Sequence, residues 1–209
     1  MKSLLSAGKI VSYLLDCICL FDIVDGVKTI GDFVSKVESL AETNFPNAQC
    51  DEKELDKLNS FKGDMLEILT EIFFYVYSAD PAVGIRDYVP VALSEDYGVD
   101  GIGTNVNGDR CAIQVKYRKN PIELITYGDI AKTDSAGRRR HNLPLEKNNT
   151  IFLFTTGEGI TSACEQVFGN VIRVINRRII SGMIDNNNNF WESANDLILL
   201  TLDNLKQDK

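Results

Sequence analysis

The chain has 209 residues, of which 44% are hydrophobic and 25% charged, so it can bury a sizeable core and has a globular composition. Its five scattered cysteines form no C-x-x-C pair and it has one histidine, which excludes a Cys/His zinc set and favours reduced thiols. The formal net charge of −8 argues, taken alone, against a nucleic-acid-binding protein.

The N-terminal part is predicted to be helical. Apolar residues recur at helical spacing over residues 3–21, and a second helix is expected over residues 27–40. Lys9 and Asp16 interrupt the first segment and no cleavage site follows, so it fits neither a signal peptide nor a membrane span. We therefore expect a cytoplasmic protein that is not secreted and has no membrane segment.

The next part is expected to begin with a long helix and then to change to strands. A helical pattern covers about residues 52–77, and Gly63 inside it leaves one helix or two open. Three short runs rich in Val and Ile predict strands, and Asn107-Gly108 between the second and third is a strong hairpin signal. These strands are expected over residues 88–93, 99–105 and 110–117.

The remainder is expected to alternate helices and strands. Helices are expected over residues 121–132, 162–168 and 177–184, strands over 150–155 and 171–175, a polar basic loop over 133–149, a linker over 185–189 and a last helix or strand over 197–202. This order predicts an α/β fold, with a central mixed β-sheet flanked by helices. We expect an N-terminal helical extension over residues 1–50 and a main domain over residues 51–209.

Polar side chains converge on the predicted hairpin. Alternation along the third strand places Gln114 and Lys116 on one face, and pairing with the preceding strand would bring Asp100 beside them. Mg²⁺ prefers oxygen ligands, and the Asp100 carboxylate, the Gln114 amide oxygen and the Val115 carbonyl could supply three. Lys116 could orient an attacking water and offset negative charge in the transition state.

The charge distribution is consistent with such a site. Residues 61–100 hold 2 basic and 8 acidic side chains, whereas residues 101–150 hold 9 basic and 5 acidic ones. An enzyme that binds a divalent cation and then phosphate groups could have this pattern. A solvated acidic protein with one basic loop could have it too, and charge alone does not separate the two.

Plain structural roles remain open for the same residues. Asp100-Gly101 could form only a turn, Gln114 and Lys116 could line the exposed face of an edge strand, and Glu67 could be a solvated helix residue. Glu95 and Asp96 fit a role at the entrance of the strand better than a role as metal ligands.

Three motifs in order, Gly63-Asp-Met-Leu-Glu67, Asp100-Gly101 and Gln114-Val-Lys116, resemble the PD-(D/E)xK nuclease superfamily, and within it the Mrr-like restriction endonucleases. Phe152-Leu-Phe-Thr-Thr-Gly and the helix, strand and helix expected after it keep the order of that family. The resemblance covers roughly residues 60–185. Two positions depart from the usual pattern of the superfamily, since Gln114 stands in place of the second acid and Val99 in place of Pro.

The resemblance implies a restriction-endonuclease-like core and a metal-dependent DNA endonuclease. It implies Mg²⁺ as the cofactor, with Mn²⁺ as a substitute, and Glu67 as a further acidic residue of the site, acting directly or through a water. The alternatives are a DNA-binding module of a larger helicase or recombination machine with little or no catalytic activity, and a nuclease similar to the Holliday-junction resolvases.

Basic residues after the third strand are candidates for contact with DNA phosphates, and a solvated loop is the alternative. These residues are Lys119, Arg138, Arg139, Arg140 and His141. Cleavage of both DNA strands requires two sites, so we expect a homodimer, with the apolar N-terminal helices as a candidate interface. A helicase fused to the chain or bound to it is a further expected partner.

Overall fold

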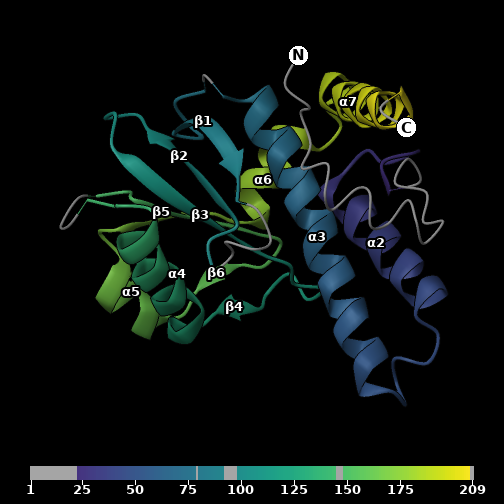
Figure 1. Cartoon of the computed structure of the whole chain (residues 1–209), viewed down its shortest axis with the longest axis horizontal. Coiled ribbons are helices and arrows are strands. Elements are labelled where there is room, and N and C mark those ends of the chain that lie inside the picture. Colours follow the sequence, from purple (N-terminus) through teal and green to yellow (C-terminus); the bar gives the residue numbers. More distant parts are fainter. Residues whose placement is uncertain (1–22, 79, 92–97, 145–147, 208–209) are drawn as a thin grey trace. The chain divides into compact units, whose positions relative to one another are not determined.

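The computed structural model of the chain describes residues 23–78, 80–91, 98–144 and 148–207 (Figure 1). Its internal contacts divide the chain into two compact units. The first consists of the residues up to Ile72 together with those from Ser181 onward, and the second is Phe73–Ile180. The expected domain boundary at residue 50 stays a prediction, and the expected helix over residues 3–21 lies outside the described residues.

The first unit is helical where it is described. Helix α2 (Ile30–Asn44) starts with a capping box, in which Asp32 N donates to Thr29 Oγ1 and Thr29 N donates to the Asp32 carboxylate, each at 3.0 Å. The expected helix over residues 27–40 was therefore placed too early, because Thr29 fixes the start. The Ile30 amide also donates to Asp185 Oδ1 at 2.7 Å, which ties α2 to the end of helix α6 (Arg177–Ile184).

Helix α3 (Glu52–Val76) is continuous, so Gly63 does not divide it. Helix α7 (Asn188–Gln207) begins inside the expected linker, of which residues 185–187 remain non-helical, and it includes the expected helix or strand over residues 197–202. Its start is fixed by Asn187, whose side-chain oxygen accepts from Phe190 N at 3.2 Å, as an N-cap residue does. The run of asparagines is therefore mainly a helix start and not a linker.

The second unit contains a mixed five-stranded sheet in the order β1-β2-β3-β5-β7 (Figure 1). The strands are β1 (Ile85–Pro90), β2 (Gly101–Asn105), β3 (Arg110–Lys116), β5 (Ile151–Thr155) and β7 (Ile172–Ile175). Strands β1, β2 and β3 pair antiparallel, and β3, β5 and β7 pair parallel. The expected hairpin joins β2 to β3, and Gly108 has the positive φ of 82° that its turn requires. The α/β class and the mixed sheet flanked by helices are thus confirmed.

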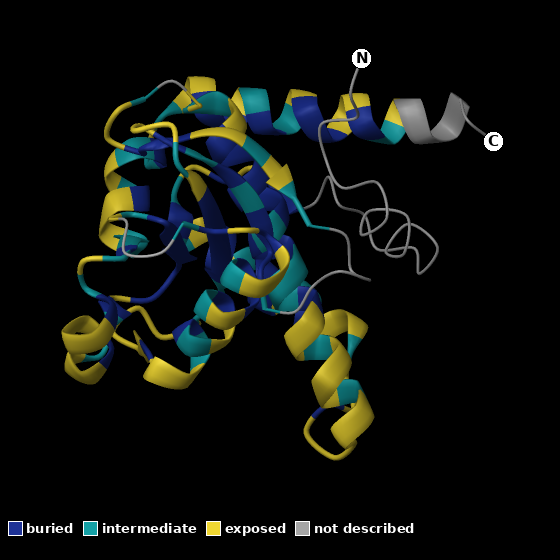
Figure 2. Cartoon of the chain, turned by 60° about the vertical axis from the view of Figure 1, so that its left-hand side comes forward, coloured by how far each residue is buried: buried dark blue, intermediate teal, exposed yellow. Residues whose placement is uncertain are grey.

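Both faces of this sheet are covered within the second unit. On one face, Ala112 and Leu153 belong to a buried cluster with residues of helix α4 (Tyr127–Arg140) and helix α5 (Ser162–Phe168). On the other face, the rings of Phe73 and Phe74, at the end of α3, lie 5.2 and 5.9 Å from that of Phe154. The strands are accordingly mostly buried in Figure 2, and β5 is buried over its whole length.

The segment between β3 and β5 differs most from expectation. In place of a helix over residues 121–132 and a loop over 133–149, the structure has strand β4 (Leu124–Ile125), paired with β6 (Gly159–Ile160), and then α4. The helix starts after Thr126, whose amide and hydroxyl both contact the Asp129 carboxylate, at 3.2 and 2.9 Å. It continues to Arg140 because basic residues in a last turn are favoured by the helix dipole.

A search of the described helices for one both long and apolar enough to span a lipid bilayer finds none.

Candidate functional site

The hairpin brings Asp100 and Gln114 together. Asp100 directly precedes β2, and its amide donates to the Ile113 carbonyl of β3 at 2.9 Å. Its Oδ2 accepts from Val115 N at 2.6 Å and also from Gln114 Nε2. Asp100 is 8% exposed and Gln114 3%. A buried carboxylate and a buried amide are therefore held together by the backbone pairing of two adjacent strands.

Gln114 lies in the interior of the protein. Strand β3 is flanked by β2 and β5, so it is not an edge strand, and α4 covers the face that carries Gln114. The alternative that Gln114 lines an exposed edge is therefore wrong. Burial of an amide and a carboxylate is costly unless each polar atom has a partner, so their hydrogen bonds define what the site can hold.

Thr133 of α4 completes the group of polar residues. It is fully buried, and its Oγ1 lies 2.8 Å from the Gly98 carbonyl, 3.4 Å from the Asp129 carbonyl and in contact with Gln114 Oε1. A hydroxyl has one proton, so it can donate to only one of these three acceptors. With Gln114 Oε1 facing Thr133, the hydroxyl has more acceptors than it can serve.

A half-turn of the Gln114 amide would exchange Oε1 and Nε2 with almost no change in shape. Nε2 would then donate to Thr133 Oγ1, and the Thr133 proton would remain for the Gly98 carbonyl at 2.8 Å. Oε1 would take the position in which Nε2 now contacts Asp100 Oδ2 and lies 3.5 Å from the Val115 carbonyl. Oε1 would then face the Val115 carbonyl and Asp100 Oδ2, which still accepts from Val115 N, and a cation is the partner that suits oxygens placed in this way.

No set of three or more His, Cys, Asp or Glu side chains within the described ranges is arranged to hold a metal ion. The candidate ligands are instead one carboxylate, one amide oxygen and one main-chain carbonyl. Hard oxygens of these three kinds suit Mg²⁺ or Ca²⁺, whereas Zn²⁺ in proteins is mostly bound by Cys and His. The donor set therefore fits a hard divalent cation.

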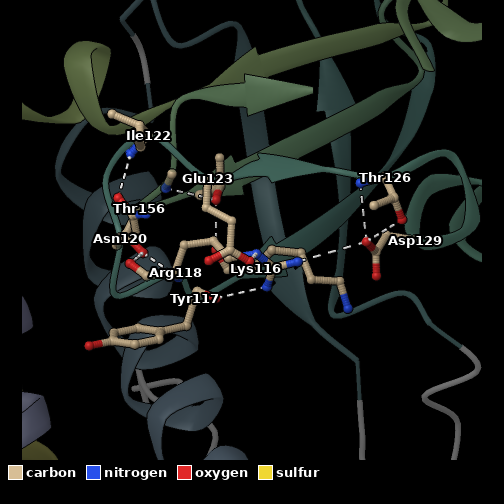
Figure 3. Close-up of polar contacts among 11 residues, drawn as sticks. Lys116, Tyr117, Arg118, Asn120, Ile122, Glu123, Thr126, Asp129 and Thr156 are labelled. Carbon is tan, nitrogen blue, oxygen red and sulfur yellow. Dashed lines mark hydrogen bonds and ion pairs between the residues drawn. The ribbon is translucent and has the colours of Figure 1, made fainter. Parts of the chain in front are cut away.

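Lys116 ends β3 and is half-buried, on the same side as Arg118 and the start of α4 (Figure 3). Its carbonyl accepts from Thr155 Oγ1 at 2.7 Å, where β3 and β5 lie side by side. Thr156 Oγ1 contacts both Arg118 N and Arg118 O, at 2.7 and 2.9 Å. The two threonines thus hold the backbone on either side of Tyr117.

Asp129 lies beside these two basic residues. Burial raises the pKa of its carboxyl, but the hydrogen bonds from Thr126 and the positive charges of Lys116 and Arg118 outweigh burial and lower the pKa below its ordinary value. The Arg118 guanidinium also forms an ion pair with Glu123, at 2.7 Å. Lys116 therefore acts within a network of charges and is not an isolated ammonium group.

The other residues expected in the site are placed as follows. Glu67 is half-buried on α3 in the first unit, so its part in the site stays a prediction. The Val115 side chain is buried, and it is the carbonyl that lies near Gln114. Glu95 and Asp96 lie outside the described residues.

The expected phosphate-binding residues lie in different surroundings. Lys119, Arg139 and Arg140 are exposed. Arg138 Nε forms an ion pair with Asp134 at 2.7 Å. His141 ends α4 and is only 9% exposed, so its side chain offers little surface to a phosphate.

Sequence reasoning missed Thr133 and Asp129, and it noted Thr155 and Thr156 only as part of a motif at the end of a strand, without their contacts to the end of β3. A signal existed for Asp129, because Thr126-x-x-Asp129 has the spacing of a capping box and marks the start of a helix. Thr133 follows Asp129 by one helical turn, but its contact with Gln114 depends on how α4 packs on the sheet. No local pattern carries that information.

Comparisons of the chain with protein-family models, with curated proteins and with solved structures found no match.

Proposed function

We propose that this protein is a Mg²⁺-dependent endodeoxyribonuclease that hydrolyses phosphodiester bonds by attack of a metal-activated water. The observation that carries the proposal is the arrangement of oxygens around Gln114. The terminal amide of Gln114 is buried between Asp100 Oδ2, the Val115 carbonyl at 3.5 Å and Thr133 Oγ1, and a half-turn of that amide would turn its oxygen toward the first two. The resemblance to the PD-(D/E)xK nucleases rests on the same residues and on the order of the three motifs in the chain.

In this proposal Asp100, Gln114 and Val115 hold the cation, and the part of Glu67 as a further acidic residue stays what the family resemblance implies. Mg²⁺ bound there, or Mn²⁺ in its place, would polarise the phosphate and lower the pKa of the attacking water. Asp100 is oriented by the Val115 amide at 2.6 Å, so the carboxylate is already positioned without the cation.

Lys116 supplies the positive charge that the reaction needs. Its ammonium group orients the attacking water and stabilises negative charge that develops on the phosphate oxygens. Thr155 holds the Lys116 carbonyl at the end of β3, and Asp129 balances the charge of Lys116 before DNA binds. Its backbone is therefore held beside β5, and its ammonium group is close enough to influence the charge of Asp129.

The test is incubation of supercoiled plasmid with the purified protein in Mg²⁺ or Mn²⁺, beside Lys116→Ala and Asp100→Asn. Lys53→Ala and Asp56→Asn, on the exposed start of α3, are matched controls for loss of one charge. Nicked or linear DNA is expected from the wild type and the controls. Lys116→Ala is expected to lower the rate by about 10²–10³-fold, as removal of one transition-state contact does. Equal cleavage by all five proteins would refute the assigned site.

A second candidate function is DNA binding without cleavage, as a module of a larger helicase or recombination machine. The observation in its favour is that Asp100 Oδ2 already accepts from Gln114 Nε2 and Val115 N, so the carboxylate is satisfied without a cation. A plasmid that is retarded in a gel but stays intact in both metals would favour this function. A four-way DNA junction in the same assay separates it from a nuclease acting only on branched DNA.

A further inference from the structure

Helix α4 carries four basic and two acidic side chains, and both acidic ones have partners in the same region. Asp129 accepts from Thr126 and lies 3.8 Å from the Arg118 guanidinium. Asp134 pairs with Arg138 at 2.7 Å, one helical turn along. The negative charges of α4 are thus compensated, which leaves a net positive charge on the rest of the helix.

That positive charge gathers along a groove. This groove is a shallow hollow of about 460 Å³, wide open to solvent, and all the residues that line it come from one face of α4: Ala131, Lys132, Ser135, Ala136, Arg139 and Arg140. Lys132, Ser135 and Arg139 are exposed. Ala131 and Ala136 are small, so the groove has a shallow apolar floor between long basic side chains.

One end of the groove lies next to the candidate metal site. Lys132 precedes Thr133, the residue that contacts Gln114. A Cβ built on Gly98 would lie 3.4 Å from Lys132 Cβ, and Gly98 is two residues before Asp100. From Lys132 to Arg139 the helix rises by about 10 Å, which corresponds to roughly three base-pair steps of a DNA strand. The groove can therefore follow a short run of phosphates that ends beside Asp100.

We propose that this face of α4 binds the phosphodiester backbone of the DNA strand that enters the site, with Lys132 and Arg139 as its phosphate contacts. The inference rests on the proposed function for the identity of the ligand. A chain with a net charge of −8 repels DNA as a whole, so a local positive surface is what would hold the substrate. Arg139 presents a planar donor fork to a phosphate, and Ser135 adds a hydroxyl between the two charges.

The neighbouring arginines Arg138 and Arg139 lie in different surroundings, so one can serve as a matched control for the other. Arg138→Ala and Arg139→Ala each remove one charge from the same helical turn, but Arg138 is paired with Asp134 and does not line the groove. The phosphate contact that the sequence suggested for Arg138 is therefore not part of this inference. Binding of a fluorescent 30-base-pair DNA duplex is measured by anisotropy in EDTA, as a function of salt concentration. The proteins compared are the wild type, Arg138→Ala, Arg139→Lys and a double variant that combines Lys132→Ala with Arg139→Ala.

The double variant is expected to bind about 10- to 100-fold more weakly at 50 mM salt, and to lower the slope of log K against log salt by about 1.8, or 0.9 for each contact. Arg138→Ala is expected to keep the wild-type slope, and Arg139→Lys to keep it as well because the charge remains. Circular dichroism of each variant shows whether α4 still folds, and if the double variant does not, Lys132→Gln and Arg139→Gln singly replace it.

An unchanged slope in folded double or single variants would overturn the inference, as would an equal effect of Arg138→Ala. Tighter binding of an RNA duplex of the same sequence would overturn DNA as the ligand. DNA binding is measured without metal, so the test of the groove does not depend on whether the protein cleaves DNA. If the wild type cleaves DNA but the variants keep its slope of log K against log salt, the groove does not bind the DNA backbone. If the double variant lowers that slope but the wild type does not cleave DNA, the protein is not a nuclease.

Discussion

The Thr133 hydroxyl is the contact through which α4 organises the candidate metal ligands, so its removal tests the site directly. Thr133→Val replaces the hydroxyl by a methyl group of similar size, and Thr133→Ser keeps the hydroxyl and removes the methyl group. The position is fully buried, so neither variant changes the surface. The two variants together separate the role of the hydrogen bond from that of packing.

The expected magnitude follows from the partners. Thr133 Oγ1 donates either to the half-buried Gly98 carbonyl at 2.8 Å or to the buried Gln114 Oε1, and the acceptor that it serves loses that donor when the hydroxyl is removed. A buried polar group left without a partner costs about 1–3 kcal/mol, so Thr133→Val is expected to lower the free energy of unfolding by that amount. Thr133→Ser loses one methyl group, which costs about 1 kcal/mol.

The measurement is urea unfolding in EDTA, followed by far-ultraviolet circular dichroism, because the single tryptophan, Trp191, lies in the first unit. A second series in 10 mM MgCl₂ measures stabilisation by the cation, which grows as RT ln(1 + [Mg²⁺]/Kd). Mg²⁺ is expected to stabilise the wild type and Thr133→Ser but to stabilise Thr133→Val less, since Thr133 no longer holds the Gln114 amide in the orientation that binds metal.

Two results would refute this reasoning. If Thr133→Val is as stable as the wild type in EDTA, the Thr133 hydroxyl makes no stabilising hydrogen bond to Gly98 or Gln114, and the expected loss of stability is wrong. If Mg²⁺ stabilises all three proteins equally, Gln114 is not oriented through Thr133, whatever the effect on stability.

Three further predictions concern groups outside this contact. The pKa of Asp129 is lowered below its usual 3.8, so its contribution to stability is present above that value and is lost as pH falls through the folded-state pKa. The stability of Asp129→Asn is therefore expected to change less on acidification than that of the wild type, in urea titrations between pH 3 and 6. Burial raises the pKa of Cys111 to about 12, so a thiol reagent at pH 7.5 is expected to label the exposed Cys50 long before Cys111. Peptide mass spectrometry measures the two labelling rates, and equal rates would contradict the buried position of β3. The proposed homodimer predicts a mass near 47 kDa (twice 23.3 kDa) in light scattering, with or without DNA, and a monomer at all concentrations would rule it out.

The parts of the fold that were predictable are those fixed by neighbouring residues. Asn107-Gly108 determines the hairpin, and the hairpin determines that Asp100 lies beside Gln114. The apolar run before Thr155 similarly indicates a strand buried on both faces. In each case a turn or a strand pattern within a few residues is sufficient.

The parts that were not predictable depend on packing between distant segments. Thr133 meets Gln114 across 19 residues because α4 crosses from β3 to β5 over the sheet, and only that crossover buries Gln114. The pairing of β4 with β6 joins two strands of two residues each, which are too short to have a pattern of their own. The separation of Arg138 from Arg139 likewise required knowledge that the segment is a helix, because two adjacent residues of a helix point in different directions.

The Gln114 amide can act both as a donor and as an acceptor, whereas an ionised carboxylate at the same position could only accept. Gln114 can offer Nε2 to Asp100 when no cation is bound and Oε1 to the cation when one is, so the Asp100 carboxylate has a partner in both states. Gln114→Glu would place two buried carboxylates together, which raises the pKa of one of them and destabilises the protein without metal. It is therefore expected to lower the melting temperature in EDTA at pH 7.5 and to increase the rise that Mg²⁺ produces.

The control is Gln166→Glu, an exposed position on α5 where the same change adds one charge far from any carboxylate of the hairpin. Gln166→Glu is expected to melt as the wild type does in both buffers. If Gln114→Glu behaves in the same way, the oxygens of Asp100 and residue 114 do not share a cation, and the metal site proposed for this hairpin is wrong. If only the Mg²⁺ response of Gln114→Glu increases, the amide is what keeps the wild-type affinity for the metal moderate, because it removes one negative charge from the ligand set.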